Sequence, residues 1–223
     1  MSHKLVQMAI RGHARTRGSD ADKRLPITPE ILEHIFRRLP TVTKSVFDSQ
    51  MFRSACSLAF SAFLRVSEFT CSSAACHHKK CLMFSSIEVT DSKLSVLLSR
   101  SKSNQFGPGQ RLLISRSSSG ICPVREFKKY SRLRRMSMPV SRPAYVLSDG
   151  SYLTPSTFNR VVKSCLQGMP EAHRYSSHSF RIGAASTARV QGVPLDAIQD
   201  AGRWKSDAFR RYLRLPTRCP ALL

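Results

Sequence analysis

The chain of 223 residues is 41% hydrophobic, which is enough to bury one sizeable core and predicts a single folded domain with at most an appendage. Lysine and arginine number 36 against 14 aspartate and glutamate, which gives a net charge of +22. A chain this basic repels itself unless a polyanion accompanies it, so nucleic acid is the first candidate partner. No apolar run reaches bilayer-spanning length and no signal peptide is evident, so we expect a soluble intracellular protein with no membrane partner.

The seven cysteines are odd in number and lack the regular spacing of a disulfide framework. We therefore expect reduced thiols, no structural disulfide and a nuclear or cytosolic location. One cluster carries the atoms that bind zinc, and it consists of Cys71, Cys76, His77, His78 and Cys81. Because its spacing matches no common structural zinc site, a surface loop of free thiols is favoured over a zinc site, and no bound metal is expected.

The first part of the chain predicts a tail and two helices. Residues 1–26 are polar and basic without sustained periodicity, and they are interpreted as a linker or disordered tail ahead of a domain over residues 27–223. A capping threonine followed by proline predicts a helix over residues 29–39. Apolar residues at helical spacing predict a second helix that runs up to Arg65 and Glu68, so Arg65 is expected near a buried helix end.

Three short apolar runs follow, at residues 87–89, 94–98 and 112–114. They predict a small antiparallel sheet, with a polar loop over residues 99–110 that reverses at Gly107-Pro108-Gly109. Further helices are predicted over residues 122–136, 155–168, 178–191, 194–201 and 206–214. The expected fold class is mainly α with a small antiparallel β-sheet. Between Ser92 and Ser148 stand twelve Lys and Arg and one acid, Glu126, so this stretch cannot neutralise itself.

Residues near the C-terminus are candidates for phosphate chemistry. Cleaving a phosphodiester without a metal requires cationic hydrogen-bond donors for the nonbridging oxygens, a nucleophile, and an acid for the leaving oxygen. His178 and Arg181 are three residues apart, so at a helix start both side chains can point to one side. Tyr212 follows two arginines on the last predicted helix, where a phosphate would be attracted.

Five motifs occur along the chain in this order: Leu64-Arg65-Val66-Ser67-Glu68, Ser101-Lys102, His178-Ser179-Phe180-Arg181, Gly202-Arg203-Trp204 and Tyr212. Taken singly, each has an ordinary structural explanation, such as a helix cap for Arg65 or a solvated charge for Lys102. Together and in this order they resemble the signature of tyrosine recombinases, the phage-integrase family, over roughly residues 25–215. Segments 101–107, 178–185 and 202–207 look closer to the enzymes of DIRS-like retroelements and Crypton transposons than to bacterial Xer-type proteins, which implies a mobile-element origin and a nuclear location.

The resemblance implies an integrase-like catalytic domain that recombines or integrates duplex DNA. Tyr212 would attack the scissile phosphate and form a 3′-phosphotyrosyl intermediate, while Arg65 and Arg181 would clamp the phosphate. Lys102 would protonate the leaving 5′ oxygen, and His178 would assist proton transfer at the tyrosine or orient the phosphate. The resemblance implies assembly into dimers and tetramers on DNA. It implies no metal, ATP, cofactor or small-molecule substrate.

The fifth active-site position has two candidates. The family usually has His or Trp nine residues before the nucleophile, where this chain has Arg203, and Trp204 lies eight before it. Trp204 is favoured, because its indole N–H can donate to a phosphate oxygen while its ring packs against the nucleophile helix, and Arg203 is the alternative. Glu68 is expected to orient Arg65.

Family members also carry a helical core-binding domain ahead of the catalytic domain. About 25 residues precede the catalytic domain in this sequence. The alternative function is therefore that of a truncated or domesticated DNA-binding protein without catalytic activity.

Overall fold

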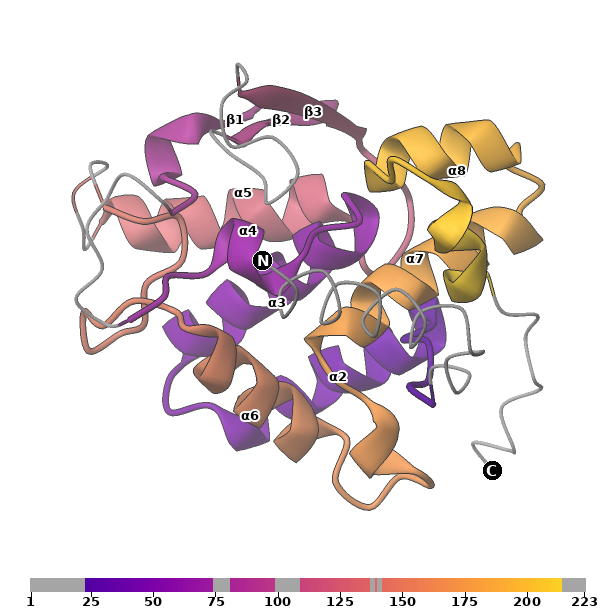
Figure 1. The fold of residues 1–223 in the computed structure, drawn as a ribbon. Helices are drawn as coiled ribbons and strands as arrows, with labels where there is room; N and C mark the ends of the chain where they lie inside the picture. The colour runs from indigo at the N-terminus through magenta and orange to yellow at the C-terminus, as the bar shows by residue number, and fades with distance from the viewer. Residues whose placement is uncertain (1–22, 74–80, 99–108, 137–138, 140–141, 214–223) are drawn as a thin grey trace, which may run out of the picture.

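Helices make up most of the computed structural model, and a small sheet lies against them (Figure 1). The structure describes residues 23–73, 81–98, 109–136, 139 and 142–213. Within them the α-helices are α2 (Pro29–Val42), α3 (Val46–Ser61), α4 (Val66–Phe69), α5 (Pro123–Arg135), α6 (Pro155–Cys165), α7 (Ser177–Val190) and α8 (Leu195–Gly202). The strands are β1 (Ile87–Val89), β2 (Lys93–Leu98) and β3 (Gln110–Ser115), and the 3-10 helices are η2 (Phe84–Ser86), η3 (Ala172–Arg174) and η4 (Asp207–Tyr212). The predicted fold class is confirmed.

The sheet is antiparallel in the order β1-β2-β3, as the three apolar runs predict. In the central strand, Val96 lies opposite Ile87 on one side and Leu112 on the other. Alternate residues of β2, including Leu94 and Val96, are fully buried, because this face of the sheet packs against α5. The strands β2 and β3 form the predicted hairpin, and the loop that carries Lys102 lies outside the described residues.

Helix α3 is the centre of the domain. It packs against α2, α5 and α7, and in Figure 1 the sheet, α5 and α3 lie in successive layers. Small buried residues such as Ser54, Ala55 and Ala59 let the neighbouring helices approach closely. Ser45 caps the helix by accepting the backbone N–H of Asp48 at 3.0 Å.

Two predicted helices differ in the structure, one in where it ends and one in its type. Helix α3 ends at Ser61 instead of running up to Arg65, because Phe63 adopts a left-handed conformation (φ 51°) and turns the chain. Arg65 is therefore the N-cap of the next helix, α4. The last predicted helix, residues 206–214, is a 3-10 helix over Asp207–Tyr212.

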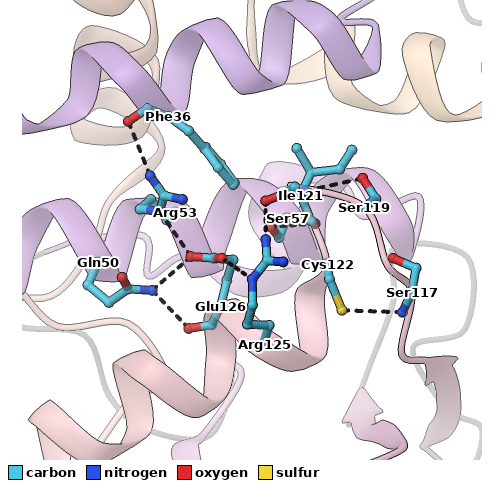
Figure 2. A network of polar contacts seen from close by, with 11 residues as sticks. Phe36, Gln50, Arg53, Ser57, Ser117, Ser119, Ile121, Cys122, Arg125 and Glu126 are labelled. Carbon is cyan, nitrogen blue, oxygen red and sulfur yellow. Dashed lines mark hydrogen bonds and ion pairs between the residues drawn. The ribbon is translucent and has the colours of Figure 1, made fainter.

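Glu126 joins α5 to α3 although its side chain is fully buried. Its carboxylate accepts hydrogen bonds from Arg53 (2.9 Å), Gln50 (3.1 Å) and Arg125 (3.0 Å), and Figure 2 shows the three donors converging on it. Burial opposes ionisation of Glu126, but hydrogen bonds from Arg53 and Gln50 and the charge of Arg53 outweigh it and lower the pKa of this carboxyl. The only acid between Ser92 and Ser148 is therefore a structural anchor for α5.

We expect the contribution of Glu126 to stability to depend on pH. A carboxyl whose pKa is lowered by folding stabilises the fold above its ordinary pKa and loses that contribution as the pH falls through the lowered value. Glu126→Gln should therefore reduce the free energy of unfolding at neutral pH by roughly 2–3 kcal/mol, and this deficit should shrink below about pH 4. Urea unfolding across this pH range measures it. Glu33→Gln, on the exposed face of α2, is the control, and a deficit that is constant with pH would contradict the prediction.

The segment just before α2 is held against α7, which carries two of the candidate site residues. The backbone N–H of Leu25 donates to Arg174 at 3.2 Å, and that of Ile27 donates to Ser179 at 3.0 Å. Gly183 makes room for this segment, since a Cβ at that position would lie 1.8 Å from the carbonyl oxygen of Ile27. The start of α7 is thereby fixed to the segment that leads into α2.

Gly183→Ala should destabilise the protein. In an ordinary helix interior, alanine is more favourable than glycine by about 1 kcal/mol. Here the added methyl must displace a backbone carbonyl, so we expect a loss of about 1–3 kcal/mol in the free energy of unfolding. Chemical denaturation followed by circular dichroism measures the sign, and an unchanged or increased stability would show that the contact is not as close as the structure has it.

The five described cysteines are all buried: Cys56, Cys71, Cys81, Cys122 and Cys165. The interpretation of Cys71 and Cys81 as part of a surface loop is therefore wrong for these two residues, which pack against Tyr152 below the surface. Cys76, His77 and His78 lie outside the described residues, and the residues that are described contain no group of three or more metal-binding side chains. No helix in the described ranges has the length and apolar character needed to cross a bilayer.

Candidate active site

The corner between α3 and α4 is the framework of the site. The backbone N–H of Leu64 donates to the carbonyl of Ala59 at 3.0 Å. The left-handed conformation of Phe63 leaves its own carbonyl available to other donors. That carbonyl accepts from the guanidinium groups of both Arg181 and Arg203. A single backbone oxygen thus brings arginines of α7 and of the end of α8 to the start of α4.

Arg181 is the most deeply buried of the candidate phosphate donors, with 1% of its surface exposed. Its guanidinium donates to the carbonyl oxygens of Phe63 and Gly202 and lies over the Trp204 ring, 4.1 Å from the ring centroid. Burial, followed by the positive charges of Arg65 and Arg203, lowers the pKa of Arg181. The group nevertheless stays charged at neutral pH, as guanidinium groups in proteins do.

Glu68 lies between two of the arginines, and its side chain is only 3% exposed. One carboxylate oxygen accepts from the Arg65 guanidinium at 3.0 Å. The other accepts from the backbone N–H of Arg65 and from Arg203, both at 2.8 Å. Three guanidinium groups (+3) and one carboxylate (−1) leave a formal charge of +2 at this corner. Glu68, which is expected to orient Arg65, contacts both its guanidinium and its backbone N–H, and Arg203 is a second partner.

Aromatic rings hold Tyr212 beside the arginines. The Tyr212 ring stacks on Trp204 with a centroid separation of 5.6 Å and meets the ring of His178 edge-on at 5.0 Å. Its backbone carbonyl accepts from the Ser186 hydroxyl at 2.9 Å, which ties the end of η4 to α7. Phe209, also in η4, is buried, and its ring packs on Trp204 with a centroid separation of 5.7 Å.

The structure brings five of the six predicted site residues into one connected cluster: Arg65, His178, Arg181, Trp204 and Tyr212. Lys102, the sixth, lies outside the described residues. Trp204 packs against η4, which carries the candidate nucleophile Tyr212, whereas the side chain of Arg203 turns inward to Glu68. The roles assigned to these residues remain predictions.

Two residues of the site were missed by the sequence analysis. The Phe63 carbonyl carries no side-chain signature, and only its unusual backbone conformation exposes it. Gly202 stands in the quoted motif, and its signal is the absence of a side chain, because a Cβ there would lie 1.6 Å from an atom of the Trp204 ring. The glycine is therefore what lets the tryptophan fold back over Arg181.

Solved structures, and not sequences, are where known proteins resemble this chain. No family model and no curated protein sequence matches the chain. Among solved structures it is similar to the XerH site-specific recombinase bound to a palindromic difH substrate after cleavage, with 15% identity, 87% of this chain and 51% of that chain covered, and a TM-score of 0.61. For a lambda integrase dimer bound to a COC′ core site, the identity is 16%, 92% of this chain and 52% of that chain are covered, and the TM-score is 0.57. For a complex of Flpe with a Holliday junction, the identity is 12%, 99% of this chain and 56% of that chain are covered, and the TM-score is 0.53.

The fold is that of the catalytic domain of tyrosine recombinases, and the family suggested by the ordered motifs is the one that contains these structural neighbours. At 12–16% identity the similarity is one of fold. The chain spans between 51% and 56% of the length of these three proteins.

The packing of Trp204 provides a direct test, because it is the only tryptophan in the chain. Gly202→Ala should push the indole off Arg181 and toward solvent, since the added methyl would overlap the ring. We expect the fluorescence emission to shift to longer wavelength. Ala201→Ser, at the exposed neighbouring position, is the control, and identical emission spectra for the two variants would contradict the packing.

Proposed function

We propose that this protein cleaves and rejoins duplex DNA through a covalent bond between Tyr212 and a 3′ phosphate. The observation that carries the proposal is that Tyr212 lies in contact with His178 and Trp204, while Trp204 also covers Arg181. The fold, shared with site-specific recombinases, supports it. So does the net charge of +22, which suits a polyanionic substrate.

The excess charge of the site matches the needs of phosphoryl transfer. A phosphodiester carries one negative charge, and its five-coordinate transition state carries two, spread over the nonbridging oxygens. The formal +2 of the Arg65, Arg181, Arg203 and Glu68 group would balance that second charge as it develops. Because these groups are already packed in place, little reorganisation would be needed at the moment of reaction.

In the proposed reaction the Tyr212 oxygen forms a bond to phosphorus as the bond from phosphorus to the 5′ oxygen breaks. The tyrosine proton passes to His178 or to water, and Lys102 donates a proton to the leaving 5′ oxygen. The products are a 3′-phosphotyrosyl end and a free 5′ hydroxyl. Attack by a 5′ hydroxyl on the same phosphorus reverses these steps, so joining consumes no external energy.

The wider biological setting is part of the proposal. The three segments that look like DIRS-like and Crypton enzymes favour an origin in a mobile element and action in the nucleus. Two protomers on each DNA site and four in a synapse follow from the resemblance. The alternative is a protein that binds DNA through the same basic surface and does not cleave it.

A suicide-substrate assay tests the proposal. The protein is incubated with end-labelled nicked duplexes that carry candidate element termini or randomised flanks. DNA that stays bound after denaturation and is released by protease is then isolated and sequenced. We expect such an adduct from the wild type and none from Tyr212→Phe, which removes only the nucleophilic hydroxyl.

Binding of the same DNA is measured in parallel as a function of salt. Equal, salt-sensitive binding by both proteins without an adduct from either, across the randomised pool, would favour the alternative function. An adduct that persists in Tyr212→Phe would reject Tyr212 as the nucleophile.

A further inference from the structure

Arg203 occupies the position nine residues before Tyr212, where the family usually places a residue that acts on the phosphate. We propose that in this protein Arg203 is instead a positioning residue, which holds Glu68 and, through it, Arg65. This inference rests on the proposed function, since Arg65 is one of the two phosphate clamps assigned there.

The hydrogen bonds of Arg203 are directed into its own protein. One terminal nitrogen donates to the carbonyl of Ala62 at 3.1 Å, and the other donates to Glu68 at 2.8 Å and to the carbonyl of Phe63 at 3.4 Å. The side chain is 6% exposed, and its third nitrogen is buried as well. A phosphate approaching from solvent would therefore have to break the Glu68 ion pair to reach this guanidinium.

The backbone of Arg203 agrees with an inward role. The residue caps the end of α8 in a left-handed conformation (φ 57°), where glycine or asparagine is the usual choice. A long side chain in this conformation is strained, because its Cβ crowds the backbone. The same left-handed turn lets consecutive side chains point in different directions, with Arg203 toward Glu68 and Trp204 over Arg181.

Glu68 transmits the effect to Arg65. With 29% of its side chain exposed, Arg65 is the more exposed partner, and both its guanidinium and its backbone N–H are bonded to this carboxylate. Without Arg203, a buried carboxylate would lose one of its two cationic partners and would shift toward solvent or toward Arg65. The guanidinium of Arg65 would then no longer be held in one orientation.

A spectroscopic test of this role does not require cleavage. In the wild type we expect a sharp, slowly rotating guanidinium N–H signal for Arg65 in proton–nitrogen correlation spectra. Arg203→Met should broaden or shift that signal as Glu68→Gln does, and Arg203→Lys should restore it in part. Arg189→Met removes an exposed arginine from the end of α7 and serves as the charge-matched control. An Arg65 signal that is unchanged in Arg203→Met would overturn the proposal.

A kinetic cycle separates an indirect role from direct contact with the phosphate. We expect Arg203→Met to slow single-turnover adduct formation roughly 10- to 100-fold, the range seen when groups that orient a metal ligand are removed. DNA affinity should stay within about twofold of that of Arg189→Met. The double variant with Glu68→Gln should be no slower than the slower single variant, because both changes break one chain of contacts.

Losses that multiply in the double variant would mean that Arg203 acts on the phosphate itself and would overturn the proposal. If Arg203→Met does not fold, as judged by thermal unfolding, Arg203→Lys replaces it in both experiments, with a smaller change of the same kind expected. If the wild type forms no adduct, the cleavage reaction fails while the Arg65 signal still decides the role of Arg203.

Discussion

The site depends on the way three guanidinium groups share one carboxylate and one backbone carbonyl. Glu68 accepts from Arg65 and Arg203, and the carbonyl of Phe63 accepts from Arg203 and Arg181. These contacts join the end of α3, the start of α7 and the end of α8, which are far apart in sequence. Any movement of one of these elements would leave a buried charge without its partner. The cost of that loss holds the three elements in fixed positions relative to one another.

The clustering of like charges at this site reduces the stability of the fold. Burial, followed by the like charges of Arg65 and Arg203, lowers the pKa of Arg181, and its named acceptors are neutral carbonyl oxygens, so the cluster is less favourable by itself than with an anion beside it. The remainder of the protein offsets that cost. Fully buried aromatic residues such as Phe158 and Phe180 pack between α3, α6 and α7, and Glu126 anchors α5 to α3. An anion beside the cluster would relieve this cost, and in the proposed reaction only the part of that gain that grows with the second negative charge would speed the step.

Periodicity and turn residues predicted most of the fold, because the helices and strands follow local patterns that the core then confirms. The predictions failed where one residue adopts an uncommon conformation: nothing in the run from Met51 to Phe63 shows that Phe63 turns left-handed and ends the helical path. Residue types in order predicted which groups would gather at the site, but not their directions. The inward turn of Arg203 depends on Glu68, which lies 135 residues away in sequence, and no local pattern records such a contact.

The neighbouring pair Arg203 and Trp204 shows why direction matters for assigning roles. Arginine is the stronger phosphate donor by chemistry, and Arg203 is the alternative to Trp204 for the fifth position. The left-handed backbone favours Trp204, because it buries the Arg203 guanidinium against Glu68 and lays the indole between Arg181 and Tyr212. The tryptophan is thus next to both Arg181 and the candidate nucleophile, while the arginine is next to Glu68, which also contacts Arg65. The two residues act on opposite sides of the same cluster, and neither could take the place of the other without a change in the backbone at Arg203.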